Sequence, residues 1–131
     1  MIGLDTNILV RYITHDDAAQ TAVVMKVMAS LSSESPGYVS LVVLVELIWV
    51  LEGFFDFKKK EVEDVVESLL RGREILLERP DLVEQAVRKF KSGNADLADC
   101  IIERAAHVAG CDYTVTFDRK AAGAGMQLLK Y

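Results

Sequence analysis

Apolar residues recur along the chain in two alternating forms, as short continuous runs and as longer segments with helical spacing. The short runs predict strands, which are Met1–Leu4, Tyr38–Ser40, Glu74–Leu77, Tyr113–Phe117 and an edge strand at Gln127–Leu129. The longer segments predict helices, which cover Ile8–Ile13, Asp16–Ser32, Leu41–Leu51, Lys58–Leu70, Pro80–Lys91 and Asp96–Ala109. Strands that alternate with helices are typical of parallel pairing through right-handed crossovers. We therefore expect an α/β fold whose sheet carries helices on both faces.

Two of the predicted strands end at an aspartate, Asp5 after the first strand and Asp118 after Tyr113–Phe117. Sheets of this kind bind their ligands at the carboxyl ends of the strands. Asp5 and Asp118 are therefore candidate site residues, which we expect to face each other across the sheet. Either one can instead be the N-cap of the helix that follows it, and the sequence leaves both roles open.

Glu46 is the one charged residue in the apolar run Leu41–Leu51. On a helix, the residues three and four positions away from it are all apolar, so no Lys or Arg can pair with it locally. An ionised carboxylate removed from water is costly unless it is paired, hydrogen-bonded or bound to a metal. Glu46 is therefore a protonated buried side chain, a partner of a distant Arg or backbone amide, or a ligand in a site.

The helix predicted at Asp96–Ala109 has an apolar and a polar face. Its polar face is predicted to carry Asp96, Cys100, Glu103 and His107. Asp99 falls at the boundary between the two faces. Asp96 as an N-cap and Asp99 as a first-turn acid favoured by the helix dipole would account for both residues without a site.

A shared site explains the positions of four acids better than separate helix caps do, because all four lie at strand ends or on helix seams of one predicted sheet. The members of this set are Asp5, Glu46, Asp99 and Asp118. Clustered carboxylates repel one another unless they are protonated or bridged by cations, and such hard oxygen ligands suit Mg²⁺ or Mn²⁺. A cation of this kind can activate water, so the set favours phosphodiester hydrolysis. The sequence has no Gly-rich phosphate loop, GxSxG or HExxH motif to favour another common enzyme class.

Length and composition limit the possible classes of protein. With 131 residues, of which 51% are hydrophobic, the chain is expected to form one domain, 1–131. The net charge of -5 argues against broad electrostatic binding to nucleic acid, unless bound cations offset the acids. Cys100 and Cys111 lack metal or disulfide spacing and are predicted to be buried thiols. No run is long enough to span a membrane and the N-terminus lacks signal-peptide features, so we expect a cytoplasmic location.

Four short motifs together resemble those of PIN-domain ribonucleases, especially VapC-type toxins. They are Asp5-Thr6-Asn7, Ser40 with the run that leads to Glu46, Asp96 to Asp99, and Thr116 to Asp118. Each motif is weak alone, whereas their order and spacing are fairly specific. The resemblance covers residues 1–131 and implies a three-layer α/β/α domain with a central, mostly parallel sheet of four to five strands. It also implies a Mg²⁺- or Mn²⁺-dependent endoribonuclease, a homodimer and a small antitoxin partner.

The resemblance assigns roles to individual residues of this chain. The acidic quartet comprises Asp5, Glu46, Asp99 and Asp118, as metal ligands and catalytic residues, with Asp96 as a lesser candidate ligand. The residues that support the quartet by hydrogen bonds are Thr6, Asn7, Ser40 and Thr116. Arg11 and Arg119 lie near the motifs and are candidates for contacting phosphate.

Three alternatives compete with this interpretation. A catalytically inactive PIN-like scaffold would bind a partner protein or RNA without cutting it. An aspartate-nucleophile phosphatase usually has a second Asp two residues after the first, where this chain has Asn7. A phospho-receiver domain would have an acidic pair before its phosphorylated Asp and a Lys after a late strand, and the sequence has neither in evidence.

Overall fold

A computed structural model describes residues 1–131, and in it the chain divides after Glu78 into two units, Met1–Glu78 and Arg79–Tyr131. Each unit has its own secondary structure and its own buried apolar residues.

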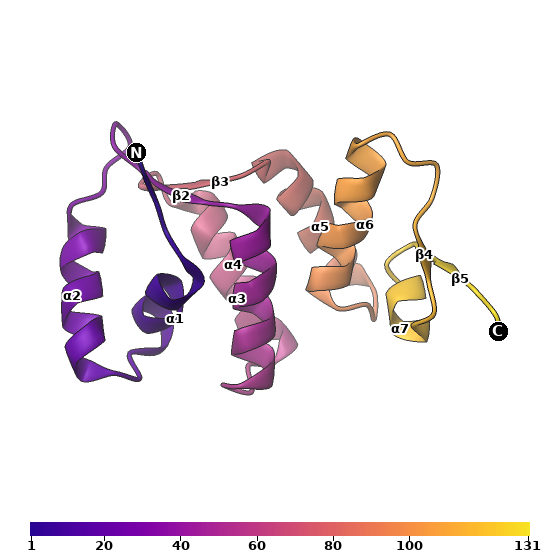
Figure 1. Cartoon of the computed structure of the whole chain (residues 1–131), viewed down its shortest axis with the longest axis horizontal. Coiled ribbons are helices and arrows are strands. Elements are labelled where there is room, and N and C mark those ends of the chain that lie inside the picture. Colours follow the sequence, from indigo (N-terminus) through magenta and orange to yellow (C-terminus); the bar gives the residue numbers. More distant parts are fainter. The chain divides into compact units, whose positions relative to one another are not determined.

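The first unit contains a parallel sheet of three strands in the order β1 (Ile2–Gly3), β2 (Gly37–Val39) and β3 (Ile75–Leu77) (Figure 1). Gly37 pairs with Ile2 on one side and with Ile75 on the other. A Cβ at this position would lie 2.6 Å from Cδ1 of Leu4, so a larger residue would force the Leu4 side chain to shift. The central strand is thereby held close to the residue that precedes Asp5.

Four helices complete the first unit, namely α1 (Thr6–Thr14), α2 (Ala18–Ala29), α3 (Leu41–Gly53) and α4 (Lys59–Arg71). Side chains cap three of them, because Asp5, Asp17 and Ser40 each accept a hydrogen bond from a backbone N–H of the first turn. Helix α1 packs against both α2 and α3, and α4 packs against β3. The fully buried side chains of this unit include Leu9, Leu44, Leu47, Leu51 and Val62. These contacts bring the start of α1 next to the middle of α3.

The second unit begins with two helices that lie side by side, α5 (Pro80–Ser92) and α6 (Leu97–Val108) (Figure 1). They bury Leu82, Val83, Phe90, Leu97 and Ile101. The chain continues through β4 (Val115–Thr116), the short helix α7 (Arg119–Ala122) and β5 (Gln127–Leu128). Strands β4 and β5 pair in parallel.

Every strand and helix predicted from the sequence is present, with ends that shift by a few residues. All strand pairs are parallel, as predicted, but the main sheet has three strands and not four or five. The other two strands form a sheet of their own in the second unit. Helix α7 was not predicted, because four residues are too few to show helical periodicity.

Two predictions about α6 and the cysteines are wrong. Cys100 and Glu103 were assigned to the exposed face of α6, yet both are buried, while Ile102 is exposed. Glu103 tolerates burial because two cations pair with it, as described below, and Cys100 behaves as a small apolar side chain. Cys111, predicted to be buried, is exposed after the end of α6. Among the helices of this chain, none combines the length and apolar character needed to cross a membrane.

Candidate functional site

A cavity of about 410 Å³ in the first unit has two of the predicted acids on its wall. Asp5 reaches it from the end of β1 and Glu46 from the middle of α3. The buried Thr6, in the first turn of α1, donates a hydrogen bond from its hydroxyl to Oε1 of Glu46. The packing of α1 against α3 thus orients one carboxylate of the cavity through a neutral side chain.

Asp5 has a role in the fold as well as a place on the cavity wall. Its Oδ1 accepts a hydrogen bond of 2.7 Å from the backbone N–H of Thr6, so Asp5 is the N-cap of α1. A carboxylate has two oxygens and several lone pairs, so this hydrogen bond does not prevent a cation from binding. The two roles that the sequence left open for Asp5 are therefore compatible.

Glu46 is exposed, which corrects the expectation that the apolar run around it would bury its charge. Helix α3 buries Leu44, Leu47 and Ile48 and leaves Glu46 and Trp49 on its exposed side. The first of the three alternatives, a buried Glu46, is therefore excluded. The apolar run around Glu46 does not reveal that one side of α3 is exposed, because that side carries apolar residues as well.

Arg11 also lines this cavity and is held by polar partners from the loop and helix that follow α1. Its Nη1 lies 3.1 Å from Oδ1 of Asp16, and its Nε donates to Oε1 of Gln20 at 2.7 Å. Asn7 is exposed on the cavity wall beside Asp5. Arg11 therefore pairs with Asp16 and not with Glu46.

The second unit brings Asp96, Asp99 and Asp118 into electrostatic contact. Asp99 is partly buried in the first turn of α6, and Asp96 occupies the N-cap position. Partial burial raises the pKa of Asp99 above its ordinary value, and the negative charges of Asp96 and Asp118 raise it further, although Lys120 opposes them. The ionised form of Asp99 is thus disfavoured where it lies.

Asp96 and Asp118 both occupy N-cap positions but differ in what their side chains bind. Asp118 is the N-cap of α7, with Oδ1 accepting from the N–H of Lys120 at 2.9 Å. Its own N–H donates to Oγ1 of Thr116 at 3.0 Å, so Thr116 supports Asp118 as a hydrogen-bond acceptor. Asp96 makes no side-chain capping bond and instead lies 2.9 Å from Nζ of Lys120. The simple capping interpretation therefore fits Asp118 and does not fit the side chain of Asp96.

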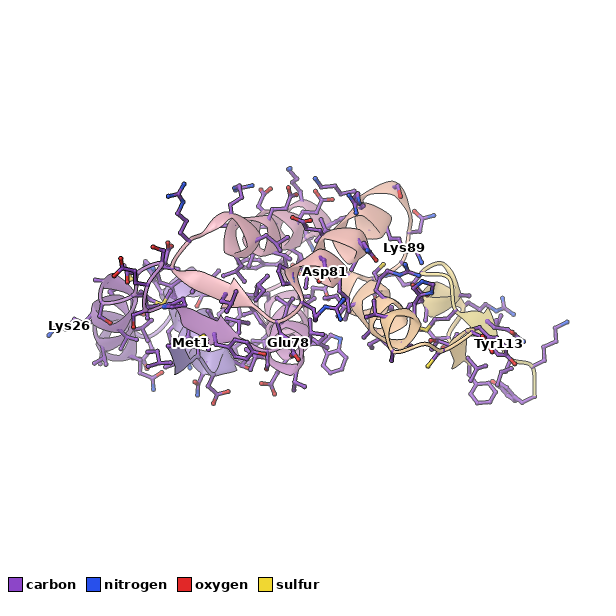
Figure 2. The ribbon with its side chains drawn as sticks, turned by 90° about the horizontal axis from the view of Figure 1, so that it is seen from above. Met1, Lys26, Glu78, Asp81, Lys89 and Tyr113 are labelled. Atoms are coloured by element: carbon purple, nitrogen blue, oxygen red, sulfur yellow. The ribbon has the colours of Figure 1, made fainter.

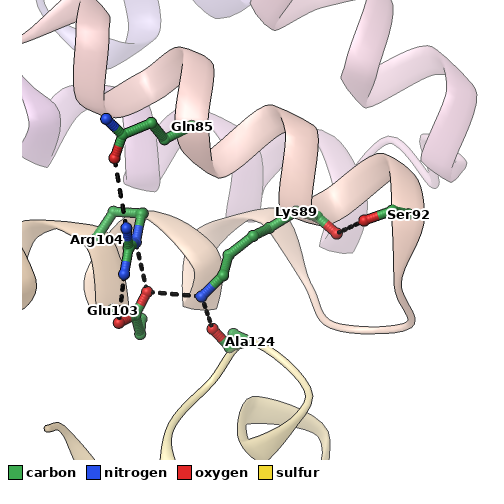
Figure 3. A network of polar contacts seen from close by, with 6 residues as sticks. All are labelled: Gln85, Lys89, Ser92, Glu103, Arg104 and Ala124. Carbon is green, nitrogen blue, oxygen red and sulfur yellow. Dashed lines mark hydrogen bonds and ion pairs between the residues drawn. The ribbon is translucent and has the colours of Figure 1, made fainter.

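A different carboxylate on α6, Glu103, is fully compensated by cations (Figure 3). Nζ of Lys89 lies 2.9 Å from Oε1 of Glu103, and Nε of Arg104 lies 2.6 Å from the same oxygen. These partners lower the pKa of Glu103 to about 2, with the Arg104 hydrogen bond as the largest cause. Lys89, which Figure 2 marks on α5, also donates to the carbonyl oxygen of Ala124 at 2.6 Å. Lys89 therefore links α5 to Glu103 of α6 and to the turn after α7.

The oxygen donors of Asp5, Glu46, Asp99 and Asp118 are of the hard type that Mg²⁺ and Mn²⁺ prefer, and the environment of Asp99 favours a nearby cation. In neither unit do three His, Cys, Asp or Glu side chains form a group that could hold a metal ion on its own. The chemistry of the donors fits a divalent cation, and the set of ligands remains a prediction.

Comparison with known proteins assigns the chain to a family. The model of the PIN domain matches residues 2–125. The chain belongs to the PIN domain family. A curated relative, a VapC ribonuclease of Aquifex aeolicus (strain VF5), is 21% identical over 118 residues, which are 89% of this chain and 87% of that protein. The PIN domain match includes all the candidate acids, extends over both units, and confirms the predicted three-layer α/β/α class.

The remaining predicted residues have the following places in this PIN domain. Ser40 is the N-cap of α3, accepting a hydrogen bond from the N–H of Val43 at 3.2 Å, and Arg119 is exposed in α7. Sequence reasoning missed Asp16, which holds Arg11, and Lys120, which pairs with Asp96. It also missed Phe54 and Phe55 on the wall of the cavity that contains Asp5 and Glu46. Two adjacent aromatic residues directly after Gly53, at the end of α3, were the available signal.

Proposed function

We propose that this protein is a metal-dependent endoribonuclease, the toxin of a toxin–antitoxin pair, that hydrolyses RNA with Mg²⁺ or Mn²⁺. Membership of the PIN domain family and the similarity to a protein named VapC ribonuclease support the proposal. The observation that carries it is the environment of Asp99, a partly desolvated carboxylate whose strongest charged neighbours are two other carboxylates. Such an arrangement costs free energy unless a cation offsets it.

The ligands proposed for the cation are Asp5, Glu46, Asp99 and Asp118, with Asp96 as a lesser candidate. When bound, the cation supplies Lewis-acid stabilisation of the phosphodiester and lowers the pKa of a water molecule. The contribution of the chain itself is orientation, since Thr6 holds Glu46 and Thr116 holds the backbone at Asp118. Arg11, whose guanidinium Asp16 steadies, and the exposed Arg119 are proposed to contact phosphate groups of the RNA.

The proposed partners follow from the same family. They are a small antitoxin protein and a second copy of the chain, in addition to RNA, and the cytoplasm is the proposed site of action. The products would carry a 5′-phosphate and a 3′-hydroxyl, because an activated water attacks phosphorus and the 3′ oxygen leaves. A catalytically inactive scaffold is the alternative that the experiment must exclude.

The test is cleavage of a mixed RNA pool by the purified protein, with the product ends mapped. We expect EDTA to stop cleavage and added Mg²⁺ or Mn²⁺ to restore it, while Asp5→Ala stays inactive with both cations. A folded wild-type protein that leaves RNA intact with either cation, and binds neither, would support the inactive scaffold. Cleavage that continues unchanged in EDTA would contradict the metal-dependent mechanism.

A further inference from the structure

The cavity that contains Asp5 and Glu46 also has an aromatic wall. Phe54 and Phe55 line it, at the end of α3, and the side chain of Phe54 is 81% exposed. Their ring centroids are 5.2 Å apart with planes inclined at 60°. Single exposed apolar residues are common and need no explanation, but two adjacent rings in a cavity with two carboxylates are a more specific arrangement.

The backbone fixes this aromatic pair in place. The N–H of Phe54 donates to the carbonyl oxygen of Val50 at 2.9 Å, and the N–H of Phe57 donates to that of Leu51 at 2.9 Å. Asp56, which follows Phe55, has a φ of 57°, and this left-handed conformation turns the chain sharply after the two rings. The backbone that carries the two rings is therefore fixed at the end of α3.

Helix geometry relates the rings to the carboxylate. Glu46 and Phe54 are separated by about two turns, or about 12 Å along the axis of α3. A phosphodiester held near Glu46 would have a flanking nucleotide within reach of such a surface. Unpaired bases stack on exposed aromatic side chains, whereas bases in a duplex are already stacked on their neighbours.

We propose that Phe54, supported by Phe55, is a stacking surface for an unpaired base next to the scissile phosphate. This inference rests on the proposed function, because it names a residue that contacts the substrate in the same site. Arg11 on the same cavity wall adds a cation for the backbone of that strand.

The experiment compares Phe54→Leu, which keeps an apolar side chain but removes the ring, with Phe54→Trp, which enlarges the ring. Binding of a fluorescein-labelled, mixed-sequence, single-stranded oligoribonucleotide is measured by anisotropy in the Asp99→Asn background, so that no cleavage interferes. We expect Phe54→Leu to weaken binding about 5- to 100-fold and Phe54→Trp to retain or strengthen it. Tyr113→Ala is the matched control, because Tyr113 is an aromatic residue of the second unit with 64% exposure (Figure 2).

A second arm uses the wild-type protein and oligoribonucleotides with an abasic nucleotide on either side of the cleaved bond. Removing the stacked base should raise KM as much as Phe54→Leu does, and the two changes together should add little. If the wild type cleaves RNA and Phe54→Leu binds and cleaves it equally well, the stacking proposal is wrong while the nuclease proposal stands. If Phe54→Leu instead weakens only self-association in ultracentrifugation, the rings serve a protein interface and the proposal is also wrong.

Discussion

Two regions of α6, its first turn and its second turn, carry carboxylates in opposite electrostatic surroundings. Glu103 is buried with Lys89 and Arg104 against it, and its pKa is lowered to about 2. Asp99, one turn earlier, is partly buried near Asp96 and Asp118, and its pKa is raised. The fold itself supplies cations to Glu103, whereas the strongest charged neighbours of Asp99 are carboxylates. We therefore propose that Glu103 stabilises the fold and that Asp99 serves a site.

The largest effect on RNA cleavage should come from replacing the carboxylate of Asp99 with an amide, whereas the same exchange at Glu103 should leave cleavage unchanged. Asp99→Asn keeps the shape of the side chain and removes its charge, so RNA cleavage should fall about 100- to 1,000-fold, the range for losing one preorganised electrostatic group. Glu103→Gln should cleave at the wild-type rate at a temperature where it is folded. Initial rates on one RNA substrate measure both variants. Equal losses in the two variants would remove the distinction between the turns.

The free energy of unfolding, in contrast to RNA cleavage, should depend on the carboxylate of Glu103. Glu103→Ala leaves Lys89 and Arg104 without their shared carboxylate, which should lower the free energy of unfolding by about 2–3 kcal/mol. This figure is below the loss of about 3–5 kcal/mol expected for a fully buried ion pair, because the Lys89 side chain is 37% exposed and water screens its charge. Urea unfolding measures the loss. Glu84→Ala, at an exposed position of α5, is the control and should change the free energy by less than about 0.5 kcal/mol.

The contribution of Glu103 to stability should also depend on pH, with a definite sign. The pKa of Glu103 is about 2 in the folded state against an ordinary value of 4.5. Its contribution to stability is therefore complete above about pH 4.5 and is lost as the pH falls toward about 2. The difference in unfolding free energy between wild type and Glu103→Ala should shrink over that interval. A difference that stays constant from about pH 6 to pH 3 would show that the ion pairs contribute nothing.

A smaller effect is expected where a neutral group orients an acid. Thr6→Val removes the hydroxyl that donates to Glu46 and keeps the buried side chain's shape, so cleavage should fall about tenfold. Thr6→Ser retains the hydroxyl and should recover most of the rate. The kcat of each variant on the same RNA substrate tests this, and a fully active Thr6→Val would exclude an orienting role for Thr6.

Local patterns predicted the elements well, because helices and strands depend on the spacing of residues near one another in sequence. The pattern failed for Glu103, since one of its partners, Lys89, lies 14 positions earlier on another helix. It failed for Glu46 because ten apolar neighbours do not reveal which side of α3 is packed. Asp5 and Asp118 were placed at strand ends correctly, because a strand followed by a polar residue and a helix is a local signal. The division of the strands into two sheets depends on long-range packing, which spacing does not encode.

The central claim is that Asp99 serves a divalent cation and Glu103 does not. Isothermal titration of Mn²⁺ into the purified full-length protein tests it most directly, with Asp99→Asn and Glu103→Gln measured under the same conditions. We predict that wild type and Glu103→Gln bind Mn²⁺ with similar affinity and that Asp99→Asn binds it at least about tenfold more weakly. Wild-type affinity in the folded Asp99→Asn protein would contradict the account.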